Sequence, residues 1–563
     1  MRRPSYQLLA AIAYLLLASI YLIYLPHAEF VLDDWFILER YQAARDAGGA
    51  EPFRVAVAIF QNLIHNQFRF YWLSFLTSYL VWLAAGYAPG VVFAVILLVH
   101  AWNAILLRQT LERLGIGSRP AFLVGVVFLL APAAHSALFW SFNISCFVWS
   151  TVWFVLYWRS LAASLVAGRL EGRAAARQAL FLVLALFSGD PVFGLLVATA
   201  PLTAWFLRSK TGLRATLLAW GTVLTAAGFY TLLVNKAPLM AMGFGLRYEF
   251  SPRRSWENFI AIINTYRRLT GLGPGAFYRL QFTWQAGAAA LLAAAVTLLG
   301  LRRADAEKTP ALRTCLLAAG LWLAAYGPIW FLRAHEYRYD YVPAPYLALA
   351  LATAALAVPA LRMPLAAALA GWLAMATLAD MGQCWIPQSR NLRAIAARLR
   401  QLPVEPHDLI IVSNTPLWLG TAPHFAFLAG WASTPFAEHV TGVHGLEAAC
   451  EIVSDAGRLR VYHRNYMRDL KPDEPRRSWV LVVEANGEVT ERRLLAQEIR
   501  GGAYRLYPLK GYTGPAPSPR EFTREQLDLA ASDIYFAAPF SHQERQGPPE
   551  AVHPRRWAEE GGR

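Results

Sequence analysis

Two adjacent aspartates follow the first long apolar run of the chain, in the stretch FVLDDWFILERY at residues 30–41. A positioned carboxylate such as Asp33 or Asp34 can take a proton as a general base. A second carboxylate beside it can raise the pKa of the first, bind a divalent cation or orient a substrate. The alternative is a solvated loop start that caps a helix beginning at Trp35, because aspartate is a good N-cap residue.

The composition is that of a polytopic membrane protein. Of the 563 residues 56% are hydrophobic and 16% are charged, whereas soluble domains are about 45–50% apolar. The net charge of +15 belongs almost entirely to residues 1–382, which hold 30 Lys+Arg and 16 Asp+Glu against 22 and 21 in the rest. This distribution fits cytoplasmic loops better than nucleic-acid binding. The four cysteines show no CxxC spacing, which argues against a zinc site or a disulfide framework.

Apolar runs separated by arginines predict about eleven membrane spans. They are expected near 5–25, 88–107, 120–134, 141–158, 178–188, 192–207, 214–233, 283–301, 314–331, 341–359 and 364–382. The first is interpreted as an uncleaved span, since its apolar run is long for a signal peptide. Residues 70–86 are rich in aromatic side chains and are expected to form an interfacial helix instead of a span.

The positive-inside rule sets the expected orientation. Five clusters of arginine and lysine fall on one side, which is therefore the cytoplasmic side. They are Arg2 and Arg3; Arg108, Arg113 and Arg119; Arg159, Arg169, Arg173 and Arg177; Arg208, Lys210 and Arg214; and Arg302, Arg303, Lys308 and Arg313. The opposite side receives residues 26–87, 234–282, 332–340 and everything after about 383. The two aspartates and the C-terminal region then share the extracytoplasmic compartment of a bacterial-type inner or plasma membrane.

The C-terminal region has the pattern of a small α/β domain. NLRAIAARLRQL is an amphipathic helix, DLIIVSNTP a buried strand, and SWVLVVEANGEVTERRLL a hairpin turning at Asn486-Gly487. We expect an all-α polytopic transmembrane domain at 1–382, with its first external loop at 26–87. An extracytoplasmic α/β domain at 383–540 and a disordered tail at 541–563 follow.

Several motifs resemble those of GT-C-fold glycosyltransferases, in the order of that family. The stretch at 30–41 resembles the aspartate motif of their first external loop. The later similar stretches are FRFYWLSFLTSYLVWLAAGYAPGVVFAVILLVHAWNAILL with His100 and Asn103, LAPAAHSALFWSFNISCFV with Pro132, His135 and Trp140, LALFSGDP with Asp190, and EYRYDYVPAP with Arg338, Tyr339, Tyr341 and Pro343. Asp190 would replace the acid of a Ser-Lys-Glu that these proteins often carry.

The pattern is most similar to the membrane domain of protein O-mannosyltransferase-like proteins that carry tetratricopeptide repeats, over roughly residues 5–360. The tail of this chain lacks their helical repeat of about 34 residues. The resemblance implies transfer of a sugar from a polyprenyl-phosphate carrier to an extracytoplasmic acceptor, usually with inversion. The acceptor would be a glycan, a lipid or a protein, and Asp33 or Asp34 would be the base. Asp33 is slightly favoured, because consecutive helical residues point to different faces.

The remaining candidates follow from this reaction. The leaving lipid phosphate needs cationic stabilisation, for which Arg338 and Arg333 have the right geometry. Tyr339, Tyr341, His335 and Glu336 are candidates for binding sugar or acceptor. His100 and Asn103 share a helix face and either line the site or join helices by hydrogen bonds. Asp190 either lines the site or caps a helix, and His135 is a candidate for lining the cavity. Trp140 either stacks on a sugar or belongs to the aromatic belt and core.

The last expectations concern a metal cofactor and the alternative functions. A divalent cation, Mg²⁺ or Mn²⁺, would be held by Asp33 and Asp34 if one is used. Nothing in the sequence resembles a Gly-rich phosphate cradle, so nucleotide-sugar chemistry has no motif. The alternatives are a transporter or flippase for a lipid-linked glycan, and a non-catalytic cell-envelope assembly protein.

Overall fold

The computed structural model describes part of the chain. These residues are 4–31, 33–49, 51–59, 72–140, 142, 145–168, 172–189, 192–207, 217, 220–221, 223–224, 251–269, 280, 282–305, 310–327, 330, 340–413, 418–419, 422–423, 430–455, 458–463, 466–470, 478–483 and 489–493. The chain divides into two compact units. The first comprises 1–26 and 56–381, and the second comprises 27–55 together with 382–563. The segment that carries the two aspartates thus belongs to the unit of the C-terminal sheet.

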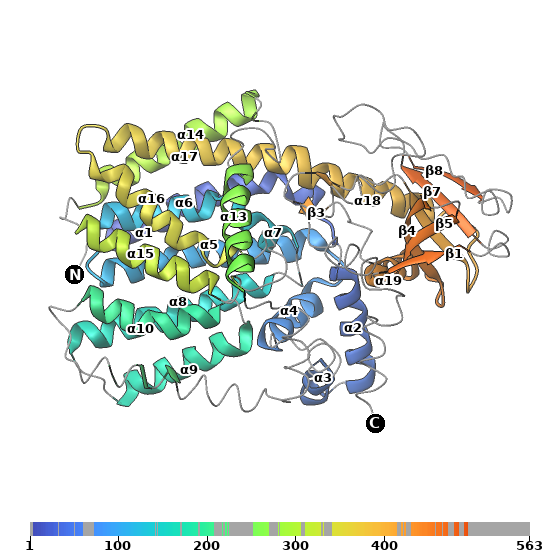
Figure 1. Cartoon of the computed structure of the whole chain (residues 1–563), viewed down its shortest axis with the longest axis horizontal. Helices are drawn as coiled ribbons and strands as arrows, with labels where there is room; N and C mark the ends of the chain where they lie inside the picture. Colours follow the sequence, from blue (N-terminus) through green and yellow to red (C-terminus); the bar gives the residue numbers. More distant parts are fainter. Residues whose placement is uncertain are drawn as a thin grey trace. The chain divides into compact units, whose positions relative to one another are not determined.

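The first unit is helical (Figure 1). Its helices are α1 (Pro4–Ala18) with the 3-10 turns η1 (Ser19–Ile23) and η2 (Leu25–His27) after it, α4 (Trp72–Ala85), α5 (Pro89–Arg113), α6 (Ser118–Leu130), η4 (Pro132–Ala134), α7 (His135–Phe139), α8 (Ser145–Ala167), α9 (Gly172–Ser188), α10 (Phe193–Phe206), α13 (Pro252–Leu269), α14 (Trp284–Arg303), α15 (Ala311–Tyr326), α16 (Ala344–Ala357) and α17 (Arg362–Asp380). The short helix α3 (Pro52–Ile59) lies at the boundary of the two units.

Several of these helices are long and apolar enough to cross a bilayer. By length and composition they are Tyr6–His27, Pro89–Arg113, Trp284–Arg303 and Arg362–Leu399, and α6 with η4 and α7 forms a fifth if this bent pair counts as one span. Shorter apolar helices include α4, α10, α15 and α16. A helix lies at each predicted span other than 214–233. In that span only residues 217, 220–221 and 223–224 are described, and they are helical. The helices indicate a membrane protein.

Glycines allow close approach of helices in this unit. A Cβ at Gly300 of α14 would lie 2.1 Å from the ring of Phe122 on α6, and one at Gly125 of α6 would lie 2.3 Å from the hydroxyl of Tyr14. The rings of Tyr14 and Phe122 stack at 5.4 Å, and the Tyr14 hydroxyl donates to the Phe122 carbonyl at 3.0 Å. Helices α1, α6 and α14 therefore pack closely against one another in this region.

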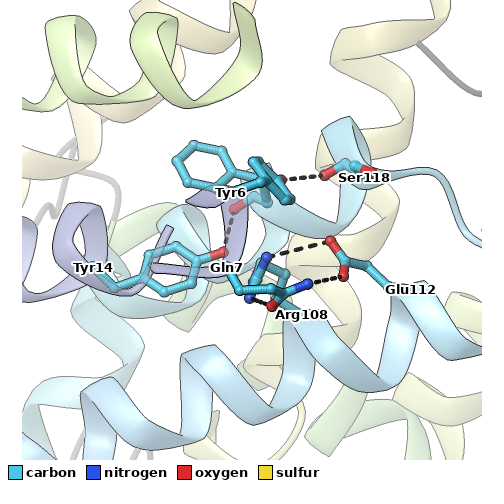
Figure 2. A network of polar contacts seen from close by, with 7 residues as sticks. Tyr6, Gln7, Tyr14, Arg108, Glu112 and Ser118 are labelled. Carbon is cyan, nitrogen blue, oxygen red and sulfur yellow. Dashed lines mark hydrogen bonds and ion pairs between the residues drawn. The ribbon is translucent and has the colours of Figure 1, made fainter. Parts of the chain in front are cut away.

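A buried ionic network joins α1 to α5 at one end of this contact (Figure 2). Arg108 contacts Glu112 at 3.4 Å and also binds the side-chain oxygen of Gln7. The Gln7 amide nitrogen lies 3.3 Å from the other Glu112 oxygen. The Arg108 guanidinium stands over the Tyr6 ring at 5.4 Å. A charge without such partners would be costly here, because its side chain is fully buried.

The second unit contains a six-stranded sheet of order β6-β5-β4-β1-β7-β8. Its strands are β1 (Leu409–Ser413), β4 (Glu447–Asp455), β5 (Arg458–His463), β6 (Tyr466–Asp469), β7 (Ser478–Val483) and β8 (Val489–Arg493), while β2 (Trp418–Leu419) and β3 (Ala422–Pro423) pair separately. Strand β1 runs parallel to β4 and β7, and the other pairs are antiparallel. The helices are α2 (Asp33–Gly48), α18 (Ile386–Leu399) and α19 (Gly430–Thr441).

The expected elements of the C-terminal region are present. Leu409, Ile410, Ile411 and Val412 of β1 are all buried, as a central parallel strand requires. The predicted hairpin is confirmed by the antiparallel pairing of β7 with β8, although its turn at Asn486-Gly487 lies outside the described residues. The predicted amphipathic helix is confirmed as α18.

The glycine contacts make a prediction about stability. Gly300→Ala should lower the free energy of unfolding by about 1–3 kcal/mol, because the new methyl group overlaps the buried Phe122 ring. Gly287→Ala on the same helix meets nothing within 4 Å and should raise it by about 0.5–1 kcal/mol through helix propensity. Thermal unfolding of the purified variants in detergent would measure both. Equal shifts of the two midpoints would contradict the packing described.

Candidate functional site

Helix α6 is broken at a proline. It ends at Leu130, Ala131 adopts an extended conformation with ψ 122, and Pro132 begins the short turn η4. The chain bends by 55° between α6 and the η4–α7 segment. Since proline has no N–H and the helix has ended, the last carbonyls of α6 lack intrahelical donors.

Side chains from three other helices donate to these carbonyls. The Tyr21 hydroxyl, on η1, donates to the Leu129 carbonyl at 2.8 Å, and His100 Nε2 of α5 lies 3.3 Å from the same oxygen. Thr377 of α17 donates to the Leu130 carbonyl at 2.8 Å. The break is therefore stabilised by segments that are far apart in the sequence.

The donor and the acceptor of each hydrogen bond can be assigned by starting at the Leu129 carbonyl. His100 Nε2 must carry a proton to donate to Leu129, so Nδ1 accepts from the Tyr341 hydroxyl at 2.9 Å. The Tyr341 oxygen in turn accepts from Asn103 Nδ2 at 3.3 Å, and that amide nitrogen also donates to the Val148 carbonyl at 3.0 Å. The buried Asn103 Oδ1 has no hydrogen-bond donor within the described part of the chain.

A buried histidine–carboxylate pair completes the network. His135 Nδ1 contacts an oxygen of Asp380, and its Nε2 lies 3.4 Å from the Tyr21 hydroxyl. Because the Tyr21 proton points to Leu129, the Tyr21 oxygen can only accept from His135 Nε2, while His135 Nδ1 faces the carboxylate of Asp380. Both side chains are fully buried. A pair of this kind can hold or pass a proton, and it also ties α7 to α17.

Three residues predicted as cavity or packing candidates, His100, Asn103 and His135, thus belong to one network with Tyr341. Trp140 is buried at the end of α7. The residues that sequence reasoning missed are Tyr21, Thr377 and Asp380. Asp380 had a usable signal, since it is an acid at the end of an apolar run and such residues are costly in a membrane unless paired.

The aspartate stretch forms a closed turn at the start of α2. The helix begins at Asp33 and not at Trp35. The buried Asp34 accepts from the Val31 N–H through Oδ2 at 3.2 Å, and the Asp34 N–H donates to the Val31 carbonyl at 3.0 Å. The Trp35 indole donates to the Phe30 carbonyl at 2.9 Å. Asp34 is therefore not the solvated start of a loop.

The same stretch is anchored to C-terminal helices of its unit. The Trp35 ring packs against Phe436 and His439 of α19, with ring centroids 5.1 and 5.2 Å apart. Arg393 of α18 binds Glu29 at 2.8 Å and the Ala28 carbonyl at 2.9 Å. The turn around Asp34 is thus held by elements more than 350 residues further along the chain.

The other candidates lie outside the described residues. They are Asp190, Arg333, His335, Glu336, Arg338, Tyr339 and the side chain of Asp33. In the described part of the chain, no group of three or more His, Cys, Asp and Glu side chains is placed to hold a metal ion.

Comparison with models of protein families, with curated proteins and with solved structures finds no match to this chain.

The network around the α6 break makes a prediction about stability. Tyr341→Phe removes the donor to His100 and an acceptor of Asn103, so it should lower the free energy of unfolding by about 1–3 kcal/mol. Tyr157 is a matched control, because its buried hydroxyl has no hydrogen-bond partner among the described residues. Tyr157→Phe should be neutral or stabilising. Denaturant titration of the two variants would test this, and a similar loss in both would contradict the network.

The packing of α2 on α19 should depend on pH. Burial, with the positive charge of Arg400, lowers the pKa of His439 below its ordinary value of 6.5. The separated helices then bind a proton more readily than the packed ones, so the packing is strongest above about pH 6.5 and weakens as the pH falls below it. Hydrogen exchange of α2, corrected for intrinsic rates, should be faster at pH 5.5 than at pH 7.5.

Two histidine variants provide the controls for this measurement. His439→Gln should abolish the pH effect on α2. His444→Gln should leave it unchanged, because the side chain of His444 is 90% exposed. An effect that survives His439→Gln would assign it to another group.

Proposed function

We propose that the protein is an integral-membrane glycosyltransferase of the GT-C type. In this proposal it has about eleven spans and moves a sugar from a polyprenyl-phosphate donor to an extracytoplasmic glycan, lipid or protein acceptor. The observation that carries the proposal is the position of the aspartate pair. Asp33 and Asp34 form the first turn of α2, directly after the first apolar span, where a base could meet a lipid-linked donor.

The two acids have different roles in this proposal. Asp34 is buried and its Oδ2 is engaged by the Val31 N–H, so its role is to fix the turn. Asp33 is the neighbouring residue in the sequence, and consecutive positions of a helix differ by about 100° around its axis, so the two acids need not share a role. We assign the general base to Asp33, and this division agrees with the preference drawn from the sequence.

The reaction then proceeds as a single displacement with inversion. The acceptor hydroxyl attacks the anomeric carbon while its proton passes to the Asp33 carboxylate. The bond from the anomeric carbon to the phosphate oxygen breaks, and the electron pair leaves with the lipid phosphate. Arg338 and Arg333 would stabilise the charge that develops on that phosphate.

The residues that follow Arg338 in the sequence are held in place, which supports the proposed contact of Arg338 with phosphate. Asp340, two residues after Arg338, is fully buried and accepts a hydrogen bond from the Tyr326 hydroxyl. Tyr341 follows and belongs to the network at the α6 break. Asp340 and Tyr341 thus give the chain a fixed point two and three residues after Arg338.

A transporter or flippase for a lipid-linked glycan is the second candidate, and the broken α6 favours it. Broken helices frequently form substrate sites in transporters. Here, however, the freed carbonyls of Leu129 and Leu130 are already bound by Tyr21, His100 and Thr377. They are therefore less suited to binding a substrate, and we prefer the enzyme.

The two aspartates can be separated by experiment. Purified protein would be assayed for release of polyprenyl phosphate from labelled lipid-linked sugars. Asp33→Asn should lower turnover about 10²–10⁴-fold with an unchanged unfolding midpoint, because it removes only the base. Asp34→Asn should lower the unfolding midpoint, since it weakens the acceptor of the Val31 N–H.

Asp46→Asn is the matched control, because Asp46 is an exposed acid on the same helix. It should leave both readouts unchanged. Turnover of Asp33→Asn equal to that of the parent would overturn the assignment of the base. Movement of intact donor across liposomes without release of polyprenyl phosphate would instead support the transporter.

A further inference from the structure

Helix α13 is fixed to the first unit by one of its faces. The Asn258 amide donates to the Trp330 carbonyl at 2.9 Å, and Ile262 is fully buried in a cluster with Tyr326. One turn further on, the Tyr266 hydroxyl lies 3.0 Å from that of Tyr326. Residues 258, 262 and 266 are four apart and so share a face, which is the attached face of the helix.

A second face of α13 is apolar and exposed. Trp256 is 63% exposed, Ile260 39% and Ile263 46%. Their spacing of four and three residues places them on one stripe along the helix. Three large apolar side chains in a row are an unfavourable surface in water and indicate a lipid or protein contact.

The direction of α13 distinguishes it from the neighbouring helices. Figure 1 shows α13 (green) running across the direction of α15 and α16, near one end of α15. Helix α15 itself exposes Leu312, Leu316 and Leu323 along one side, as a lipid-facing helix does. A helix that crosses the end of such a segment has the orientation of one lying in the plane of the interface.

The charge of α13 suits an anionic surface. Its sequence holds four arginines, at 253, 254, 267 and 268, and one acid, Glu257, which gives a net charge of 4 − 1 = +3. The side chain of Arg253 is 88% exposed and lies 2.9 Å from Glu257. Arginine and an apolar stripe with tryptophan together are the features of helices that bind anionic membranes.

We propose that α13 lies in the bilayer interface and binds the anionic phospholipids of that leaflet. Trp256, Ile260 and Ile263 enter the acyl region, and Arg253 contacts headgroup phosphate. The proposal is independent of the glycosyltransferase assignment, because it uses only the surface of α13. A second copy of the chain is the competing occupant of this stripe.

Photocrosslinking in nanodiscs tests the occupant. The full chain would carry p-benzoylphenylalanine in place of Ile260, or in place of Leu316 on α15 as the bilayer reference. In discs of phosphatidylcholine with one quarter phosphatidylglycerol, position 260 should form lipid adducts with a yield near that of position 316. Mass spectrometry would identify the adducts. A chain-to-chain product in place of lipid adducts would overturn the proposal.

The charge variants test the preference for anionic lipid. Arg253→Gln should lower the share of phosphatidylglycerol among the adducts at position 260 about fivefold, because one surface cation contributes roughly that factor. Glu257→Gln should raise the share, since it removes the acid beside Arg253. Shares that do not change in either variant would overturn the role of charge. Retention of the gel-filtration profile would show that both variants are folded.

Discussion

The first unit depends on one constraint, that backbone carbonyls in an apolar environment must find donors within the protein. The break in α6 frees carbonyls of this kind, among them those of Leu129 and Leu130. Tyr21, His100 and Thr377 donate to them, which fixes η1, α5 and α17 around one point. Hydrogen bonds next to the proline that ends α6 thus join four segments, α6, η1, α5 and α17.

A similar constraint applies to two groups of buried charged side chains in this unit. His135 with Asp380, and Arg108 with Gln7 and Glu112, each join segments that are distant in sequence. An isolated charge would cost several kcal/mol in this environment. A paired charge has few alternative partners, so it can also define the register of the helices, α7 with α17 in one case and α1 with α5 in the other.

The sequence predicted the helices and strands better than it predicted which residues contact one another. Long apolar runs encode helices locally, and the spacing of His100 and Asn103 placed them on one face. Their shared partner Tyr341 is 241 and 238 residues away, and no local pattern encodes that contact. In the sheet, the apolar runs of β1 and β7 were recognisable. Strands β4, β5 and β6 were not predicted, because polar and charged residues interrupt their alternation. The start of α2 at Asp33 was likewise missed.

The second unit gives the aspartate stretch a support that the sequence did not indicate. Trp35 packs on α19, and Arg393 of α18 binds the segment just before the turn. In the proposed reaction a base must be held within a fraction of an ångström, and a turn closed only by its own backbone is too soft for that. The C-terminal helices supply the missing rigidity. The proposed role of this region is therefore to position α2.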